Sequence, residues 1–566
     1  MKLRPLGLFL LTAGFAVLLG DLTPLGAQTK EEKKAMRLAL KNKLALPPTP
    51  ATPAAPEKPV TPPKPLTPPL ATKDPVALSK YIDAQIEKKL TEAKIPTSPV
   101  CSDAEFLRRV YLDLTGVIPP ADKAKAFLDS TDPDKRAKLI DELLDSPNFG
   151  KRLSDIWQAK LLTRDSANRF VQREPFVKWL EKSFNENTPW DKFAYSVVTA
   201  SGPADENPAV TFFLTNRAVD KLTDSVAQNF LGIQLQCAQC HNHPFTTWKQ
   251  TEYWGMATFF SKVQPDNPKN PNKGADNTKI GVSEGPGKAR GKDFFPESAK
   301  DVPAKFLGAE EPKLSPREPY RPALGTWMTS PQNPYFARAM VNRTWALLFG
   351  SGFVNPVDDM TPENVASHPD LLDGLSVQFA ADGFDVKHMY RAICNSKTYQ
   401  RTSKPLPGNK TDDQLFSHMT VKVMSPEQLF DSITQVTGAS RIPQEKGKPP
   451  ITTKGGPGGP RDQFVNFFLA GSEKTSPTEY EAGIPQALRL MNNRITANPN
   501  LARGFAASGD SPATVIEKMY LATVSRRPTP AELDNLTNYV KSNSANEAYG
   551  DILWALLNSS EFTMVK

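Results

Sequence analysis

The segment Cys237-Ala-Gln-Cys240-His241 is the part of the sequence best suited to carry chemistry. Two thiols separated by two residues can form thioether bonds with the two vinyl groups of one heme, and the adjacent histidine then ligates the iron as its proximal ligand. The chain has only 4 cysteines and 5 histidines, so this pattern is unlikely to arise by chance. It predicts one covalently attached heme c, held by Cys237, Cys240 and His241.

Two other readings of the same residues stay open. The cysteines could form a redox-active CxxC disulfide, but such motifs normally sit in a βαβ context that this sequence lacks. With His241 and His243 they could bind zinc, although ligands spaced this tightly give poor tetrahedral geometry, and structural zinc sites usually take a second ligand pair from elsewhere.

A sixth iron ligand is not evident from the sequence. His243 lies too close to His241 to reach the opposite face of a heme, so the distal candidates are Met256, His368 and His388. Each also has an ordinary structural interpretation: Met256 as a core residue, His368 as a helix-start residue in Ser-His-Pro, and His388 as part of an amphipathic helix. An empty distal position, which favours ligand or peroxide chemistry, is the other option. A distal histidine would require the C-terminal part of the chain to close over the motif.

Aromatic residues are dense just after the motif, and they could wall a heme pocket or form an ordinary helical core. They are Phe245, Trp248, Tyr253, Trp254, Phe259 and Phe260.

A second group of residues predicts a buried polar cluster that joins two parts of the chain, or the lining of a substrate cleft. Its members are Asn342, Arg343, Trp345, Asp358 and Asp359. The remaining cysteines, Cys101 and Cys394, could pair in an oxidising compartment, but nothing in the sequence brings them together.

The elements that must position these residues are predicted to be almost all helices. Apolar residues recur at helical spacing, and a side-chain oxygen followed by proline opens a helix at Ser425, Ser511 and Thr529. We expect a mainly α fold of two helical units, 76–263 and 312–566. A Pro/Gly-rich linker at 264–311 joins them, and 442–462 forms a Gly/Pro loop inside the second unit.

The N-terminus predicts export. Lys2 and Arg4 precede an apolar run from Leu6 to Leu19, which is too short to span a bilayer and typical of a signal peptide, here 1–27. Leu25 is an imperfect residue for cleavage, so an uncleaved membrane anchor is the alternative. Residues 28–75 predict a short basic helix and a proline-rich tether. We expect a protein of the periplasm or cell surface, where c-type heme is attached.

Composition narrows the function classes. The net charge of +8 is small for 566 residues and spread along the chain, so we expect no nucleic-acid partner. The sequence has no P-loop, GxGxxG turn, GxSxG elbow or HExxH motif, which argues against the common nucleotide-binding, hydrolase and zinc-protease classes. No reaction is predicted from these features.

Beyond the motif, long stretches resemble a known family: the planctomycete-type cytochrome-c-like domain of unknown function, followed by its C-terminal companion domain. The matching runs are FLRRVYLDLTGVIPP (106–120), KRAKLIDELLDSPNFGKR (135–152), CAQCHNHPFTTWKQTEYWGMATFF (237–260), NPYFARAMVNRTWALLFGSGFVNPVDDM (333–360), SHPDLLDGLSVQFAADGFDVKHMYRAICNSKTYQRTS (367–403), SPEQLFDSITQVTG (425–438), PQALRLMNNRI (485–495) and LLNSSEF (556–562). The family more often has Asp where this chain has Asn242.

The resemblance implies an exported protein with a heme-binding CxxCH and no known reaction. We therefore expect a c-type-cytochrome-like protein that transfers electrons or serves as the heme subunit of a redox complex. Its expected partners are a redox protein and the cytochrome c maturation machinery. The alternative is a cell-surface scaffold or binding module, in which the CxxCH is vestigial or a structural metal site.

Overall fold

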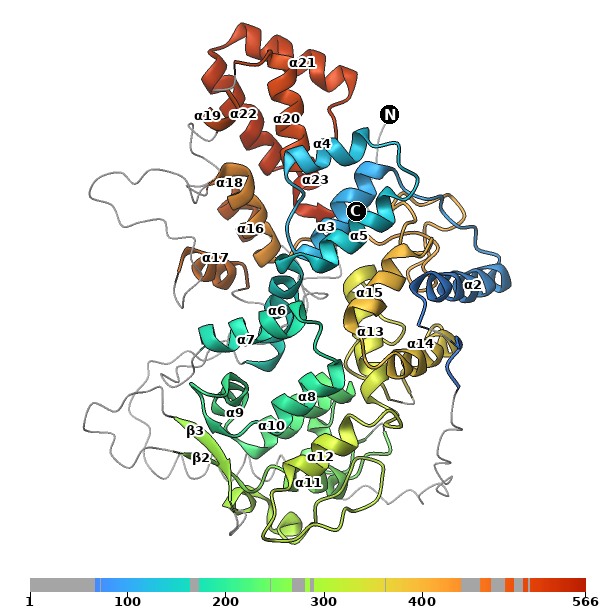
Figure 1. Cartoon of the computed structure of the whole chain (residues 1–566), viewed down its shortest axis with the longest axis vertical. Coiled ribbons are helices and arrows are strands. Elements are labelled where there is room, and N and C mark those ends of the chain that lie inside the picture. Colours follow the sequence, from blue (N-terminus) through green and yellow to red (C-terminus); the bar gives the residue numbers. More distant parts are fainter. Residues whose placement is uncertain are drawn as a thin grey trace, which may run out of the picture. The chain divides into compact units, whose positions relative to one another are not determined.

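The computed structural model describes residues 67–71, 73–162, 173–244, 246–266, 280–285, 290–361, 363–438, 459–469, 484–492, 502–506 and 509–566. The described chain is mainly helical, as predicted (Figure 1). The predicted signal peptide, the basic helix and most of the proline-rich tether and of the 442–462 loop lie outside the described residues. None of the helices described is long and apolar enough to cross a membrane.

The first predicted unit is a succession of helices that leads to the CxxCH motif. They are α2 (Pro75–Ala93), α3 (Asp103–Thr115), α4 (Ala121–Asp129), α5 (Lys135–Asp145), α6 (Pro147–Leu161), α7 (Arg173–Asn185), α8 (Trp190–Val198), α9 (Thr211–Thr215), α10 (Val219–Val226), the π-helix η2 (Ala227–Leu231), the 3₁₀ helix η3 (Gln236–Gln239) and α11 (Gln250–Thr258). A further 3₁₀ turn, η1 (Pro208–Val210), precedes α9.

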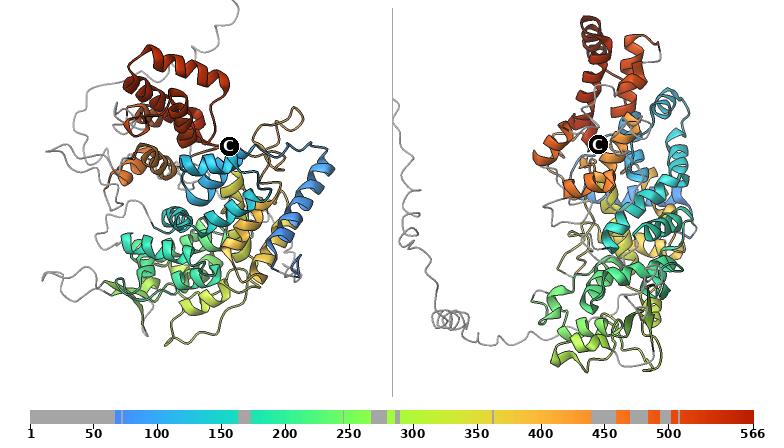
Figure 2. Two further views of the ribbon diagram at one scale, coloured as in Figure 1. Left: turned by 45° about the horizontal axis from the view of Figure 1, so that its top comes forward. Right: turned by 90° about the vertical axis from the view of Figure 1, so that its left-hand side faces the viewer.

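The second predicted unit is also helical. Its helices are α12 (Arg321–Met328), α13 (Phe336–Phe349), α14 (Pro369–Ala381), α15 (Val386–Asn395), α16 (Pro426–Thr437), α17 (Pro460–Leu469), α18 (Ile484–Met491), α19 (Arg503–Ala506), α20 (Pro512–Val524), α21 (Pro530–Ser542), α22 (Ala545–Leu557) and α23 (Ser560–Thr563). Helices α20, α21 and α22 pack against one another (red in Figure 2), and α4 of the first unit packs against α20.

The strands of the described chain are short. In one antiparallel sheet, β3 (Gly281–Glu284) lies between β1 (Gly202–Pro203) and β2 (Val263–Asp266). In the other, β4 (Lys422–Val423) pairs with β5 (Met564–Val565). Strand β3 and most of β2, with the 3₁₀ helices η5 (Arg290–Phe294) and η6 (Glu297–Ala299), fall in the segment predicted as a linker.

One hydrophobic core crosses both predicted units. It extends from Leu78 in α2 to Met419, with Leu521 added from α20. The ring of Phe306, inside the predicted linker, stacks on Phe259 of the first unit at 5.3 Å and on Trp327 of the second at 5.0 Å. The two units are therefore joined by shared apolar packing, which stabilises roughly in proportion to the area removed from water.

A second core gathers the C-terminal helices. It runs from Met424 to Val565 and also includes Leu112 and Ile118, which come from α3 and the residues after it. Arg108, in the same helix, donates hydrogen bonds to the carbonyl oxygens of Thr523 and Phe562. Helix α3 thus belongs to both cores.

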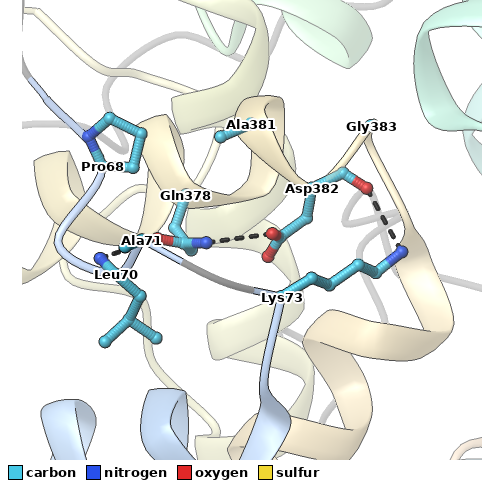
Figure 3. A pocket seen from close by; sticks show the side chains of 8 residues that line it. All are labelled: Pro68, Leu70, Ala71, Lys73, Gln378, Ala381, Asp382 and Gly383. Atoms are coloured by element: carbon cyan, nitrogen blue, oxygen red, sulfur yellow. Dashed lines mark hydrogen bonds between the residues drawn. The ribbon is translucent and has the colours of Figure 1, made fainter.

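The end of the predicted tether is described from residue 67 and lies against α14. The backbone N–H of Leu70 donates to Gln378 Oε1 at 3.1 Å, and Lys73 Nζ donates to the carbonyl oxygen of Asp382 at 3.3 Å (Figure 3). A pocket of about 560 Å³ lies between the tether end and this helix. Its lining residues are Pro68, Leu70, Ala71, Lys73, Gln378, Ala381, Asp382 and Gly383.

Candidate functional site

The CxxCH motif lies on the surface, between the π-helix η2 and α11. Cys237 is in the short helix η3, and Cys240 directly follows it. Both thiols are exposed and free. His241 is also exposed. The three side chains that the sequence predicted for heme attachment are thus accessible together in one turn.

The imidazole of His241 has a defined tautomer. Its Nδ1 lies 2.7 Å from the backbone carbonyl oxygen of Asn242. A carbonyl oxygen can only accept a hydrogen bond, so Nδ1 carries the proton and the neutral ring keeps its lone pair on Nε2. A backbone carbonyl is one of the usual acceptors by which proteins orient the second ring nitrogen of a metal-ligating histidine. The free thiols and this tautomer fit covalent heme attachment.

Helix α11 folds back onto the motif and holds its carbonyl groups. The amide Nε2 of Gln250 donates to the carbonyl oxygens of Gln239 at 3.1 Å and Cys240 at 3.0 Å. The indole N–H of Trp254 donates to the same Gln239 oxygen at 3.0 Å. The backbone N–H of Gln250 donates to Asn242 Oδ1 at 2.9 Å, which satisfies a donor at the start of α11.

The π-helix before the motif is tied to the second predicted unit. Arg343 in α13, 2% exposed, donates to the carbonyl oxygens of Asn229 at 2.6 Å and Gln228 at 3.2 Å. It also forms an ion pair with Asp358, whose second oxygen lies 3.1 Å from Lys160 Nζ of α6. Asn342, Arg343 and Asp358 of the predicted polar cluster are therefore buried, and they join the two units at the π-helix and α6, whereas Asp359 is half-buried.

The pKa of Asp358 reflects this pairing. Burial raises the pKa of the carboxyl group, but the charges of Arg343 and Lys160 outweigh burial and hold the pKa below its ordinary value. The neighbouring Asn342 donates from its side chain to the carbonyl oxygens of Val354 at 3.0 Å and Val357 at 3.1 Å, which fixes the loop that carries Asp358.

Two family models match the chain. PSCyt2, described as a protein of unknown function (DUF1549), covers residues 81–265, and PSD1, described as a protein of unknown function (DUF1553), covers residues 320–462. The chain carries the PSCyt2–PSD1 domain pair. No curated protein and no solved structure matches it. The CxxCH motif lies in the PSCyt2 segment, and the Arg343–Asp358 pair lies in the PSD1 segment.

The aromatic residues after the motif are core residues of the PSCyt2 segment. Trp248, Tyr253, Trp254, Phe259 and Phe260 are each 8% exposed or less, whereas Phe245 lies outside the described residues.

Two of these rings connect the motif to later parts of the chain. The ring of Trp248 meets Tyr335 of PSD1 edge to face at 6.4 Å, and Trp254 packs against Phe295 at 4.5 Å. The rings therefore form an apolar base beneath the exposed turn, and PSD1 contributes to that base.

A buried carboxyl–phenol pair lies under the same turn. Tyr253 Oη donates to Asp224 Oδ1 at 3.1 Å. Burial raises the pKa of Asp224, and burial together with the nearby carboxylates raises the pKa of Tyr253. This pair was not identified from the sequence, because nothing in the spacing of α10 and α11 indicates that the two residues meet.

The candidate distal ligands occupy three separate places. Met256 lies in α11 and is fully buried. His368 is the N-cap residue of α14, and its ring packs against Phe353 at 5.9 Å and Phe416 at 5.5 Å. His388 lies in α15 of PSD1, with Nε2 3.2 Å from Asp382 Oδ2.

Among the described residues, no hydrogen bond, ion pair or ring contact joins His368 or His388 to the segment from Cys237 to His241. The distal ligand stays a prediction. PSD1 does reach the neighbourhood of the motif through Met360, whose N–H donates to the carbonyl oxygen of Gly232 at 2.8 Å.

Within the described part of the chain, no group of three or more His, Cys, Asp or Glu side chains is arranged to hold a metal ion. The other two cysteines, Cys101 and Cys394, are buried and free. Burial raises the pKa of both thiols, which keeps them protonated.

Proposed function

We propose that this PSCyt2–PSD1 protein is an exported c-type-cytochrome-like protein that carries one heme, covalently attached at Cys237 and Cys240. The observation that carries the proposal is the exposed turn in which two free thiols, at Cys237 and Cys240, are followed directly by an imidazole with an available Nε2. Heme bound there would supply a one-electron redox couple. The protein would transfer electrons to a redox partner, alone or as the heme subunit of a complex.

The chain's own residues have distinct tasks in this proposal. The Cys237 and Cys240 thiols anchor the cofactor, and His241 presents Nε2 while Asn242 holds its opposite nitrogen. Buried side chains, among them Ala238 and Trp254, keep water from the inner side of the turn. A drier surrounding raises the reduction potential of such a centre, because it disfavours the more highly charged oxidised state.

The decisive experiment is production in a host that exports the chain and contains a cytochrome c maturation system. We expect heme that stays with the chain on a denaturing gel, with a pyridine hemochrome spectrum equivalent to one heme per chain. Cys237→Ser with Cys240→Ser should abolish the stain. Gln234→Ser is the matched control, because it changes an exposed side chain of the same loop and leaves both thiols in place. Wild-type protein without covalent heme in this host would refute the proposal.

A cell-surface scaffold or binding module is the second candidate. It is favoured by the docking of the tether end on α14, where Leu70 hydrogen-bonds to Gln378 and Lys73 to Asp382 beside a pocket (Figure 3). A pull-down from the native host with wild-type and doubly substituted protein separates the two functions. Partners that bind equally well without Cys237 and Cys240 would support the scaffold, and loss of the partner with the heme would support electron transfer.

A further inference from the structure

We infer that Gln250 is a positioning residue, which holds the CxxCH turn so that His241 keeps its Nε2 available for iron. This inference rests on the proposed function and names the residue that sets its geometry. Gln250 is not part of the motif, and it lies ten residues after Cys240 at the start of α11.

Both hydrogens of the Gln250 amide are used on the turn. They go to two consecutive carbonyl oxygens, those of Gln239 and Cys240. The Gln250 main chain contributes a third hydrogen bond, from its N–H to Asn242 Oδ1. A glutamine amide has two N–H hydrogens, so both donors of the Gln250 side chain form hydrogen bonds with the turn. Trp254, one helical turn later, adds a fourth bond to Gln239.

These four bonds fix the residues on either side of the histidine. The carbonyl group of Cys240 belongs to the peptide plane that continues into His241, so holding that oxygen orients the histidine backbone. Asn242 is held by its side chain, and its main-chain carbonyl then accepts the Nδ1 proton of His241. Gln250 therefore acts on the imidazole from both directions along the chain without touching it.

An exposed turn needs such support. The side chains of Cys240, His241 and Asn242 are all exposed, so apolar burial does not select one conformation for them. Hydrogen bonds from α11, whose later residues Tyr253–Thr258 are buried, provide that selection instead. When supporting hydrogen bonds already hold the ligating side chains in place, those side chains lose less conformational entropy on binding the cofactor.

The test compares two substitutions that add the same charge. Gln250→Glu is nearly isosteric and removes both amide donors. Asn242→Asp also adds one negative charge, beside the same histidine, but keeps the oxygen that accepts the Gln250 N–H. The heme-free protein is labelled with ¹⁵N, and long-range ¹H–¹⁵N correlations measure the ratio of Nδ1–H to Nε2–H tautomers of His241 at a pH where the ring is neutral.

We expect the Nδ1–H form to dominate in wild type and in Asn242→Asp. In Gln250→Glu the tautomer ratio should fall roughly fivefold, which is the effect of losing the net stabilisation of about one hydrogen bond. Trp254→Phe keeps an aromatic ring and removes only the indole donor, so it should shift the ratio in the same direction by less. This second variant keeps the test usable if Gln250→Glu fails to fold.

The heme-loaded protein supplies an independent readout. Redox titration should give Gln250→Glu a midpoint potential different from that of Asn242→Asp. Both variants add one negative charge, but only Gln250→Glu also removes the amide hydrogen bonds that position His241. A wild-type tautomer ratio in Gln250→Glu and Trp254→Phe would overturn the role of Gln250 while leaving heme binding intact. Absence of heme from wild-type protein would overturn the proposed function, and with it the iron role of the turn.

Discussion

Replacement of Asp358 by asparagine should destabilise the protein by about 3–5 kcal/mol, because it leaves the buried Arg343 without its carboxylate partner. The Arg343 side chain is only 3% exposed, and its other bonds go to the neutral carbonyl groups of Gln228 and Asn229. The asparagine keeps the shape of the site and removes only its charge. The cost is therefore that of removing a carboxylate charge from the buried Arg343 guanidinium and from Lys160, rather than that of a cavity.

The expected change can be measured by scanning calorimetry. The compact unit runs from Lys64 to Lys566. An unfolding entropy of about 2 cal/mol/K per residue over roughly 500 residues gives about 1 kcal/mol/K. A loss of 3–5 kcal/mol then lowers Tm by about 3–5 °C. Faster amide hydrogen exchange should appear first in η2, since Arg343 binds its carbonyl groups.

The neighbouring Asp359→Asn is the matched control. Asp359 is half-buried and accepts one side-chain hydrogen bond, from Asn364 at 3.0 Å, so Tm should stay within about 1 °C of wild type. The pKa of Asp358 is lowered in the folded state. The ionised carboxylate therefore adds to the free energy of unfolding above the ordinary carboxyl pKa, and this stabilisation is lost as the pH falls through the lowered value. A Tm for Asp358→Asn that matches the control at neutral pH would refute the reasoning.

Three further predictions follow from buried groups. His368 is buried, and burial lowers its pKa to about 4, so this residue should make stability fall as the pH drops from about 6.5 to 4, by about 1.4 kcal/mol per unit; urea unfolding of His368→Gln should show a pH slope that is shallower by about this amount, and an unchanged slope would contradict the assignment. Arg108→Met removes hydrogen bonds to carbonyl groups of α20 and α23, so hydrogen exchange measured by mass spectrometry should speed up there and not in α13. Gly232→Ala should cost about 1–3 kcal/mol in urea unfolding, since φ is +68° and a new Cβ would displace the end of Met360 and lie 3.2 Å from Ala339 Cβ in α13; Gly438→Ala, with φ +58° and open space, should cost less, and equal costs would count against crowding at Gly232.

The starts of the helices were largely predictable, because they depend on neighbours in sequence. Ser425 and Thr529 cap α16 and α21 as expected, each in a complete capping box. At the start of α3, Ser102 and Glu105 have the spacing of a capping box, but only half of it is present. Ser102 accepts the N–H of Glu105, but the Glu105 carboxylate instead binds Arg109, because a buried arginine competes more strongly for it.

The long-range partners were not predictable from spacing. Arg343 and Asp358 were expected to share a polar cluster, but their contact with the π-helix depends on how α13 packs. Cys237, Cys240 and His241 could be predicted from the sequence, because the CxxCH motif consists of five consecutive residues. The role of Gln250 could not, because it requires α11 to fold back over the turn. A polar residue at the first position of the helix after the motif is the only signal that the sequence offers.

The sharing of α3 between two cores has a consequence for how the chain acquires its structure. Leu112 and Ile118 complete a core whose other members begin at Met424, about three hundred residues later in synthesis. One side of α3 therefore stays uncovered while most of the chain emerges, and contacts of such long sequence separation form slowly. The last residues, including β5, close the final contacts with α3. The early segment thus depends on the late one to finish folding, and chaperone protection of the nascent chain would be needed longest at α3.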